Sequence, residues 1–470
     1  MRQSRAFPYV LPVVVFFTAL IYCLGLHGIF VYDDIEQIVN RNALHHLTNL
    51  HDVIFCGLRQ NRVWQNISFA LNWSIAPGQT WGFKLFSLFL HLANGSLLYL
   101  WLKKMFADQP YLPVLATSLF LIHPLQIQSV TYIMSVDVLF QAFFYFLALY
   151  WYSKYSLTRL PGLIMILIAS LLARETCVFI PVVLLVYELW IHQTSFKDLP
   201  KQKWAALFAL PLLYYPLSRI LHDPGASMYL GIGGLYPFWK HLATQLYFQS
   251  FYLVLFLNPR LQSLIHANPP FDLWLAAGAT IGALIWVGGF GFLLRQRKHF
   301  PRASFFIFLF FLSYLPTNSF LQLINPFAEY RLYLSNLPLC ILLAYGILRL
   351  SSRLTVPAVI LTYFAVFTFQ NVMIWKSWDL IFNQAFHRYP NYDFNANGMG
   401  VEYLAVAWRE YQSGNYPRAW EIVGRIEKST GRYPLPARFF NLKDALEQKM
   451  NALGLSTVHH WDEEHEPIQK

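Results

Sequence analysis

Long apolar runs alternate with short polar stretches along most of this chain. A transmembrane helix needs about 20 consecutive, mostly apolar residues, so each run is a candidate for a membrane-spanning segment. Twelve candidates lie at residues 9–30, 83–102, 111–127, 135–153, 160–173, 175–191, 204–221, 241–257, 270–294, 303–324, 333–348 and 355–375. The pattern therefore predicts an all-α, polytopic membrane domain over residues 1–375.

Composition supports a membrane protein and argues against several other classes. Of the 470 residues, 56% are hydrophobic and 13% are charged, whereas soluble domains carry about 25% charged residues. The net charge of +11 comes without a nucleic-acid-binding motif, so no nucleic-acid partner is expected. The four cysteines are scattered and predict neither a disulfide framework nor a zinc site. The lipid bilayer is thus the first partner that the sequence predicts.

Basic residues in the short loops predict the orientation, because Lys and Arg favour the cytoplasmic side. Arg2 and Arg5 place the N-terminus inside. The basic cluster at 295–298 lies inside only if the run at 241–257 does not cross the membrane. We therefore expect eleven crossings, an external C-terminus and a first external loop at about 31–81.

Residues 376–455 differ in composition and predict a small external helical domain. Six residues follow the spacing of one tetratricopeptide repeat, namely Tyr403, Ala407, Tyr411, Gly414, Tyr416 and Ala419. The alternative interpretation is an ordinary helical hairpin. Residues 456–470 have the composition of a disordered tail.

Two adjacent carboxylates, Asp33 and Asp34, follow the first apolar run directly. Acidic residues at the membrane surface are costly unless they have a partner or a function. One alternative is that either residue caps a helix that continues to Asn40. Because capping needs only one of the two, the pair favours catalysis, in which a carboxylate takes a proton from a reacting hydroxyl group.

Other charged residues stand at the ends of apolar runs on the predicted external side: His123, Arg174, Glu175, Glu329 and Arg331. Arg331 is suited to bind phosphate, because its planar guanidinium can reach two oxygens, although an ion pair with Glu329 is the alternative. Arg174 and Glu175 equally fit a structural pair. His123 precedes a proline and equally fits a broken helix end at which its ring nitrogens are satisfied.

Taken in order, these stretches resemble the GT-C superfamily of polytopic glycosyltransferases. They are most similar to the transmembrane and tetratricopeptide-repeat O-mannosyltransferase family and its bacterial relatives, over nearly the whole chain. The matching segments are 30–34 with Asn40, 86–97 with His91 and Asn94, His123-Pro124 with Val130, Arg174-Glu175, 328–334 and the repeat-like tail. There are three departures. Arg174 replaces the usual lysine, Asp137 lacks the arginine that usually accompanies it, and the tail holds one clear repeat instead of an array.

The resemblance implies transfer of a sugar, mannose or similar, from a polyprenyl-phosphate donor to an acceptor hydroxyl on a protein or a glycan. It implies that Asp33 is the base and that Asp34 supports it. Arg331 would bind the donor phosphate, with Arg174 and His123 as further ligands. Asp137, Glu175 and Glu329 would support these groups.

The resemblance also implies a periplasmic or lumenal active site and O-glycosylation, in a bacterial inner membrane or, alternatively, the endoplasmic reticulum. No cofactor is expected. A divalent cation is not favoured, because such a site needs about six oxygen ligands and the loop adds only Glu36 and Asp52.

A transporter or flippase for a polyprenyl-linked lipid or a solute is the alternative function. Transporter sites usually lie near the midplane of the membrane, at the interface between repeats. Here the acids cluster at one surface and the spans show no internal repeat, which favours the transferase.

Overall fold

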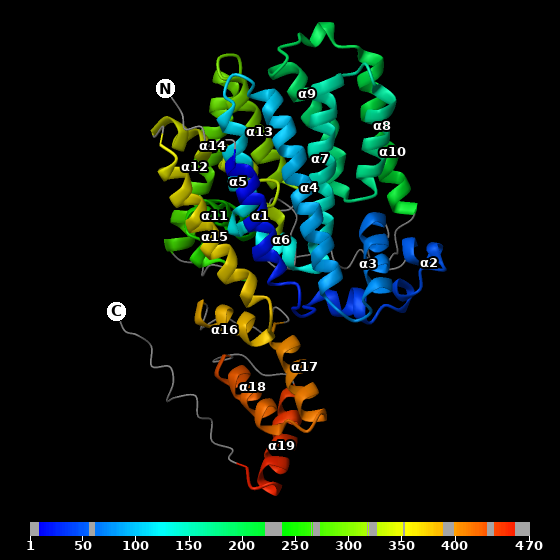
Figure 1. The fold of residues 1–470 in the computed structure, drawn as a ribbon, viewed down its shortest axis with the longest axis vertical. Helices are drawn as coiled ribbons and strands as arrows, with labels where there is room; N and C mark the ends of the chain where they lie inside the picture. Colours follow the sequence, from blue (N-terminus) through cyan, green and yellow to red (C-terminus); the bar gives the residue numbers. More distant parts are fainter. Residues whose placement is uncertain are drawn as a thin grey trace. The chain divides into compact units, whose positions relative to one another are not determined.

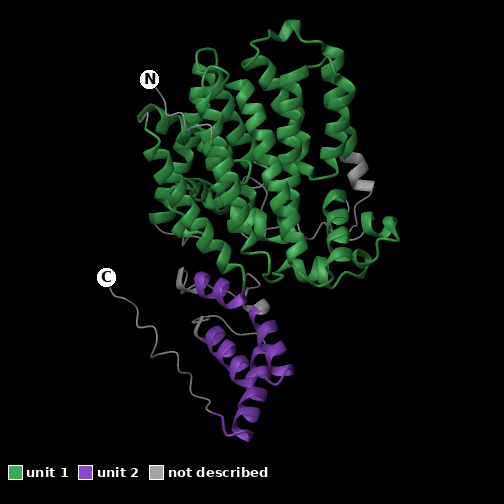
Figure 2. Ribbon diagram, viewed as in Figure 1, with its two compact units in different colours: residues 1–376 green, residues 377–470 purple. Residues whose placement is uncertain are grey.

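The structure is a computed structural model that describes residues 9–55, 62–220, 237–264, 266, 273–316, 318, 327–350, 353–388, 399–429 and 437–455. The chain divides into two compact units, Met1–Lys376 (unit 1) and Ser377–Lys470 (unit 2), which Figure 2 colours separately. Within the described residues, all regular secondary structure is helical.

Unit 1 is a bundle of helices that run up and down side by side (Figure 1). Its helices are α1 (Val10–Cys23), α2 (Leu50–Phe55), α3 (Val63–Ile75), α4 (Trp81–Met105), α5 (Tyr111–Ile122), α6 (Ile127–Thr131), α7 (Val136–Tyr155), α8 (Leu160–Leu171), α9 (Ile180–Trp190), α10 (Lys201–Ile220), α11 (Phe238–Leu257), α12 (Leu273–Gln296), α13 (Pro301–Tyr314), α14 (Asn336–Leu350) and α15 (Thr355–Ile374). Each predicted apolar run overlaps one of these helices.

Four helices in the described part are long and apolar enough to cross a membrane: α4, Ile133–Tyr155, α12 and α15. A fifth span results if α5 and the helical turns after it are counted as one segment, bent by 55° at the break. The protein is therefore helical and membrane-embedded. The predicted eleven crossings stay a prediction.

The first helix ends at Cys23, although the apolar run continues to Phe30. The cause is close packing at two glycines. A Cβ on Gly25 would lie 2.4 Å from Val372 Cγ1, and one on Gly28 would lie 2.1 Å from Lys84 Nζ. The chain leaves the helix here in order to pass tightly against α4 and the end of α15.

The third apolar run is also interrupted, at His123 and Pro124. The proline lacks an N–H and disfavours helical geometry in the residue before it. Two 3₁₀ turns, η4 (Pro124–Gln126) and η5 (Ile133–Ser135), flank α6 before α7 begins. We call residues 123–135 the broken segment. Every residue in it is buried.

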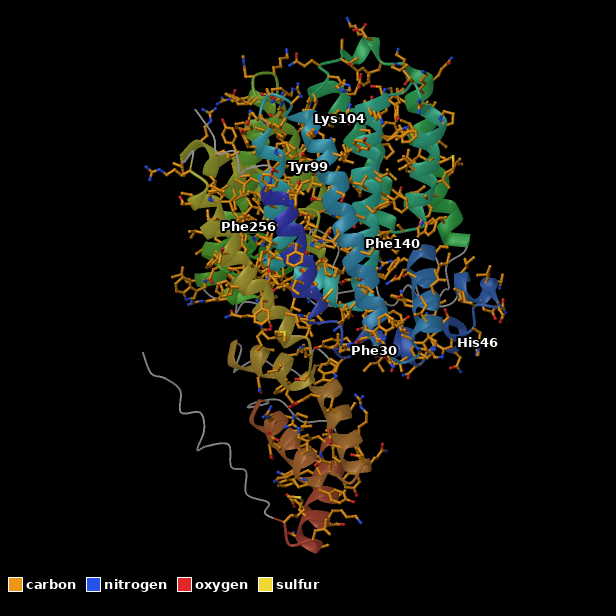
Figure 3. The ribbon with its side chains drawn as sticks, in the orientation of Figure 1. Phe30, His46, Tyr99, Lys104, Phe140 and Phe256 are labelled. Atoms are coloured by element: carbon orange, nitrogen blue, oxygen red, sulfur yellow. The ribbon has the colours of Figure 1, made fainter. Side chains whose placement is uncertain are left out.

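The two ends of unit 1 carry different groups. Phe30 and His46 lie at one end, and Lys104 lies toward the other (Figure 3). Arg302 Nη1 donates to both oxygens of Asp108, over 2.7 and 2.9 Å. The α12–α13 connection therefore lies at the same end as the α4–α5 connection. This supports the predicted grouping of the basic loops, while their cytoplasmic placement stays a prediction.

Unit 2 consists of α16 (Trp378–Arg388), α17 (Met399–Gln412), α18 (Tyr416–Ser429) and α19 (Ala437–Ala452). Helices α17 and α18 form a hairpin whose turn contains Gly414 at φ +83°, a conformation that favours glycine. Asp379 accepts a hydrogen bond of 2.7 Å from Tyr403 and pairs with Arg418. The hairpin is present, and its assignment to a tetratricopeptide repeat stays a prediction. The predicted tail at 456–470 lies outside the described residues.

Candidate functional site

Asp34 fastens the loop after α1 to the broken segment. Its side chain is fully buried. Oδ2 accepts the Val31 N–H over 3.0 Å, and Oδ1 accepts the Met134 N–H over 2.9 Å. The following π-helical turn, η2 (Ile35–Val39), has no side-chain cap. Asp34 therefore holds two backbone segments together, and the capping alternative does not describe it.

Asp33 occupies the opposite environment. It is exposed, and its side chain makes no hydrogen bond or ion pair within the part of the chain that the structure describes. The preceding Tyr32 has φ +48°, in the left-handed region that non-glycine residues seldom adopt. Backbone strain of this kind clusters at functional sites. After this strained residue, Asp33 lies at the surface and Asp34 points into the protein.

The inward carboxylate is electrostatically coupled to Lys84. Burial raises the pKa of Asp34 to about 8, although its two backbone N–H donors and the charge of Lys84 lower it. Lys84 is buried in the first turn of α4 and donates to the Gly25 carbonyl over 3.3 Å. Lys84 was not predicted from the sequence. A lysine inside an apolar run is itself a signal of function, and it would have identified this residue.

Arg62, Asp137, Arg174 and Glu175 form a second group, which we call the four-charge cluster. Arg62 pairs with Asp137 and donates from Nη2 to Glu175 Oε1 over 2.8 Å. Arg174 Nη1 lies 3.3 Å from Asp137 Oδ2. The structure thus brings together three predicted residues and adds Arg62. Arg62 supplies an arginine beside Asp137, where the sequence lacks one locally.

The electrostatics of the four-charge cluster favour the ionised forms. Burial alone would lower the pKa of Arg62, but Asp137 and Glu175 raise it. Arg62 and Arg174 hold the pKa of Glu175 well below its usual range. The Glu175 side chain is 49% exposed, whereas Arg62 is 7% exposed. Glu175 is therefore the one member of the cluster with ready access to water.

His123 uses both ring nitrogens within the fold. Nδ1 accepts the Leu125 N–H over 3.2 Å, and Nε2 donates to the Phe256 carbonyl over 3.1 Å. The ring also stacks on Phe256 at 4.4 Å. This geometry matches the alternative of a satisfied histidine at a broken helix end. A phosphate could bind His123 only by replacing one of these two bonds.

Glu329 is buried and is held by two partners from the chain after α11. Its Oε1 accepts the Ser263 N–H over 2.8 Å and contacts His266 Nε2 over 2.7 Å. His266 was not predicted. Arg331 is half-buried, and its guanidinium carbon lies 5.7 Å from the centre of the Tyr330 ring.

The broken segment connects these groups. Gln128 accepts the Tyr330 N–H over 2.7 Å, and Ser129 donates to the Tyr330 carbonyl over 3.2 Å. At its other end, Met134 binds Asp34 through its N–H and accepts from Gln65 through its carbonyl, over 2.8 Å. The predicted acid pair, the four-charge cluster and the Arg331 segment are therefore arranged around one buried support.

Two residues of α4 bind the segment that carries Arg331. His91 Nδ1 lies 2.7 Å from the Tyr333 hydroxyl, and Asn94 Nδ2 donates to that hydroxyl over 3.2 Å. His91 and Asn94 stood out in the sequence, and they position the start of α14. Among the described residues, no group of three His, Cys, Asp or Glu side chains is placed to hold a metal ion.

Comparisons of the chain with protein-family models, curated proteins and solved structures found no match.

Proposed function

We propose that this protein is a membrane glycosyltransferase that moves a sugar, mannose or similar, from a polyprenyl-phosphate donor to an acceptor hydroxyl. The observation that carries the proposal is the division of the acid pair. Asp33 is exposed, while Asp34 is buried and fixed by two backbone N–H groups. One carboxylate can reach a substrate, and its neighbour holds it in place.

The reaction assigns a role to each carboxylate. Asp33 accepts the proton of the acceptor hydroxyl, as a general base does. The hydroxyl oxygen then forms a bond to the anomeric carbon of the sugar. The bond from that carbon to the phosphate oxygen breaks, and its electron pair stays on the phosphate. Asp34 touches neither reactant and positions Asp33 through its contacts to Val31 and Met134.

The leaving phosphate gains negative charge in this step, and cations that lie near it lower the barrier. Arg331 fits this role, because its segment is bound to the broken segment that also binds Asp34. Its guanidinium can bind two phosphate oxygens at once, which a lysine cannot do. Arg174 is the second cation of the proposed site.

The lipid donor suits a membrane-embedded protein, because a polyprenyl phosphate keeps its chain in the bilayer and its head group at the surface. We place the reaction at the periplasmic face of a bacterial inner membrane, with the lumenal face of the endoplasmic reticulum as the alternative. The acceptor would be a hydroxyl on a protein or a glycan, which makes O-glycosylation the proposed outcome.

The test uses the purified full chain in lipid nanodiscs with radiolabelled polyprenyl-phosphate mannose and a hydroxyl-bearing acceptor. We expect donor consumption and release of free polyprenyl phosphate, both abolished by Asp33→Asn. Asp52→Asn is the matched control, since Asp52 is an exposed carboxylate in the same loop whose side chain, among the described residues, hydrogen-bonds to its neighbours Asn49 and His51. An intact donor after prolonged incubation would overturn the proposal, and movement of intact donor across the membrane would support the transporter.

A further inference from the structure

Arg62 and Arg174 carry more hydrogen-bond donors than the surrounding protein accepts. Each side chain is only 7% exposed. Within the described residues, Arg62 Nε and Arg174 Nε have no hydrogen-bond acceptor, and Arg174 Nη1 makes an ion pair with Asp137 Oδ2 but no hydrogen bond. Buried donors on charged groups are normally satisfied, because leaving them unpaired is unfavourable. The four-charge cluster thus has fewer hydrogen-bond acceptors than its two arginines have donors.

In this arrangement the carboxylates of the cluster do not make up the shortage. Asp137 Oδ2 already faces both arginines, and Asp137 Oδ1 accepts the Val138 N–H over 2.9 Å. Glu175 Oε1 accepts from Arg62 Nη2. An arginine has five N–H donors and no acceptor, so two arginines beside one shared carboxylate oxygen leave donors over. An anion with several oxygens would satisfy them.

Glu175 is the group that such an anion can replace. Its side chain is 49% exposed, so it can turn toward water, and the oxygens of the incoming anion then replace it as acceptors for the buried Arg62. With Glu175 in place, the two arginines and two carboxylates sum to zero charge. When Glu175 turns outward, Arg62, Arg174 and Asp137 leave one net positive charge. That charge matches a phosphodiester, which carries one negative charge.

We propose that the four-charge cluster is a phosphate-binding site in which Arg62 and Arg174 bind the phosphodiester of a lipid-linked sugar and Glu175 is the carboxylate that this phosphate displaces. The inference rests on the proposed function for the identity of the lipid, and it adds Arg62 as a ligand and Glu175 as a competitor. Arginine pairs bind phosphate strongly because each can make two parallel hydrogen bonds.

Binding is measured apart from transfer, with radiolabelled polyprenyl-phosphate mannose, the full chain in nanodiscs and no acceptor. We expect Arg174→Gln to weaken binding by about tenfold or more, the scale of a lost charged hydrogen bond, and Arg62→Gln to weaken it similarly. Glu175→Gln should tighten binding severalfold, because it removes the competing charge. A purely structural cluster would give the opposite result, with Glu175→Gln lowering the melting temperature and leaving binding unchanged, and that result would overturn the inference.

Controls separate the possible sources of failure. Arg302→Gln breaks an exposed ion pair at the opposite end of unit 1 and should leave binding unchanged. If Arg174→Gln does not fold, Arg174→Lys keeps the charge, loses the two-pronged contact and should bind more weakly. Inorganic phosphate as competitor tests whether phosphate itself is recognised, since it should displace the lipid from the unmodified protein. Failure to displace it would overturn the site.

The same assay keeps this inference distinct from the proposed function. Asp33→Asn should bind the donor normally and fail only in transfer. Normal donor binding in Arg62→Gln and Arg174→Gln would overturn the inference and leave the transferase standing. Donor binding that follows the expected pattern, without any transfer, would reject the transferase and retain the phosphate site.

Discussion

The backbone N–H of Met134 donates to Asp34 Oδ1 over 2.9 Å, although 100 positions separate the two residues in the chain. This bond joins the loop after the first helix to the middle of the bundle. Asp34 fixes Asp33 through it, and Asp33 alone of the pair reaches the surface. The two carboxylates therefore call for different experiments.

Asp33→Asn should lower turnover by at least about a hundredfold, the range for loss of a positioned general base. The side chain is exposed and makes no hydrogen bond or ion pair with the described residues, so the melting temperature should stay unchanged. Turnover with radiolabelled donor and thermal unfolding, measured on the same preparation, check both parts. Normal turnover in Asp33→Asn would reject Asp33 as the base.

Asp34→Asn should affect folding more than Asp33→Asn does and turnover less. An asparagine keeps one acceptor oxygen and turns an NH₂ toward the other backbone N–H, which leaves that donor unsatisfied. Near the ordinary pKa of 3.8, where protonation of Asp34 adds little to the balance, the cost should be about 1–3 kcal/mol of unfolding free energy. Denaturant or thermal unfolding measures it. An unchanged stability would mean that the contacts to Val31 and Met134 contribute nothing.

The raised pKa of Asp34 should make stability depend on pH. Native Asp34 keeps its proton up to about pH 8, whereas its ordinary pKa is 3.8. Between these two values the native state binds more protons than the unfolded chain, so the free energy of unfolding falls as pH rises. The melting temperature should therefore decrease across this range. The decrease should be shallower in Asp34→Asn, and an equal slope in both proteins would contradict the assignment.

Arg331→Lys should keep part of the activity, and Arg331→Ala should keep very little. Lysine retains the positive charge but loses the planar fork that binds two oxygens. The loss should fall on kcat more than on donor affinity, because the phosphate charge grows toward the transition state. Steady-state kinetics and donor binding on the two variants separate these effects. A pure affinity loss would assign Arg331 to ground-state binding only.

Gly28→Ala should destabilise unit 1. The new Cβ would lie 2.1 Å from Lys84 Nζ and 2.7 Å from the Trp375 carbonyl oxygen, and the backbone oxygen cannot move aside easily. A cost of about 1–3 kcal/mol is expected for overpacking of this kind. Gly346→Ala in α14 is the matched control, since its Cβ would meet no heavy atom within 4 Å. Equal melting temperatures for the two variants would contradict the close approach at Gly28.

Cysteine labelling tests the topology in a background from which the native cysteines are removed. Lys298→Cys and Lys104→Cys should be labelled from the same side, because the Arg302–Asp108 pair joins their two connections. His46→Cys should be labelled from the other side (Figure 3). Labelling of Lys298→Cys and His46→Cys from one side would reject the predicted arrangement.

The helices were predictable because apolar runs of sufficient length have few alternatives to helix in a membrane. The points at which the helices are interrupted were harder to predict. The early end of α1 depends on contacts of Gly25 and Gly28 with residues in α4 and α15, which no local pattern reveals. A break at His123 and Pro124 was predictable, since proline is a local signal for the end of a helix. The path of the broken segment after Pro124 was not predictable from the sequence.

In the candidate site, too, features with a local sequence signal were predictable, and features that depend on distant contacts were not. Asp33 and Asp34 were identified by their position, but the sequence does not reveal which of the two turns inward. Arg62 and His266 were missed, because each acts through a distant partner, Asp137 and Glu329 respectively. Arg174 and Glu175 were identified, while the ion pairs that Arg62 makes with Asp137 and Glu175 depend on contacts between distant parts of the chain. Lys84 differs from Arg62 and His266, because a lysine inside an apolar run is a local signal.

The broken segment has one further consequence, for how this protein varies among organisms. Met134 of this segment hydrogen-bonds to Asp34, and Gln128 hydrogen-bonds to Tyr330. The number of residues between Gln128 and Met134 therefore sets the distance between Asp34 and Tyr330. Removing or adding one residue in a helical stretch turns everything after it by about 100°. Insertions and deletions should therefore be excluded here, while substitutions that keep burial are tolerated. A constant number of residues between Gln128 and Met134 is thus a better marker for distant relatives than the identity of the residues between them.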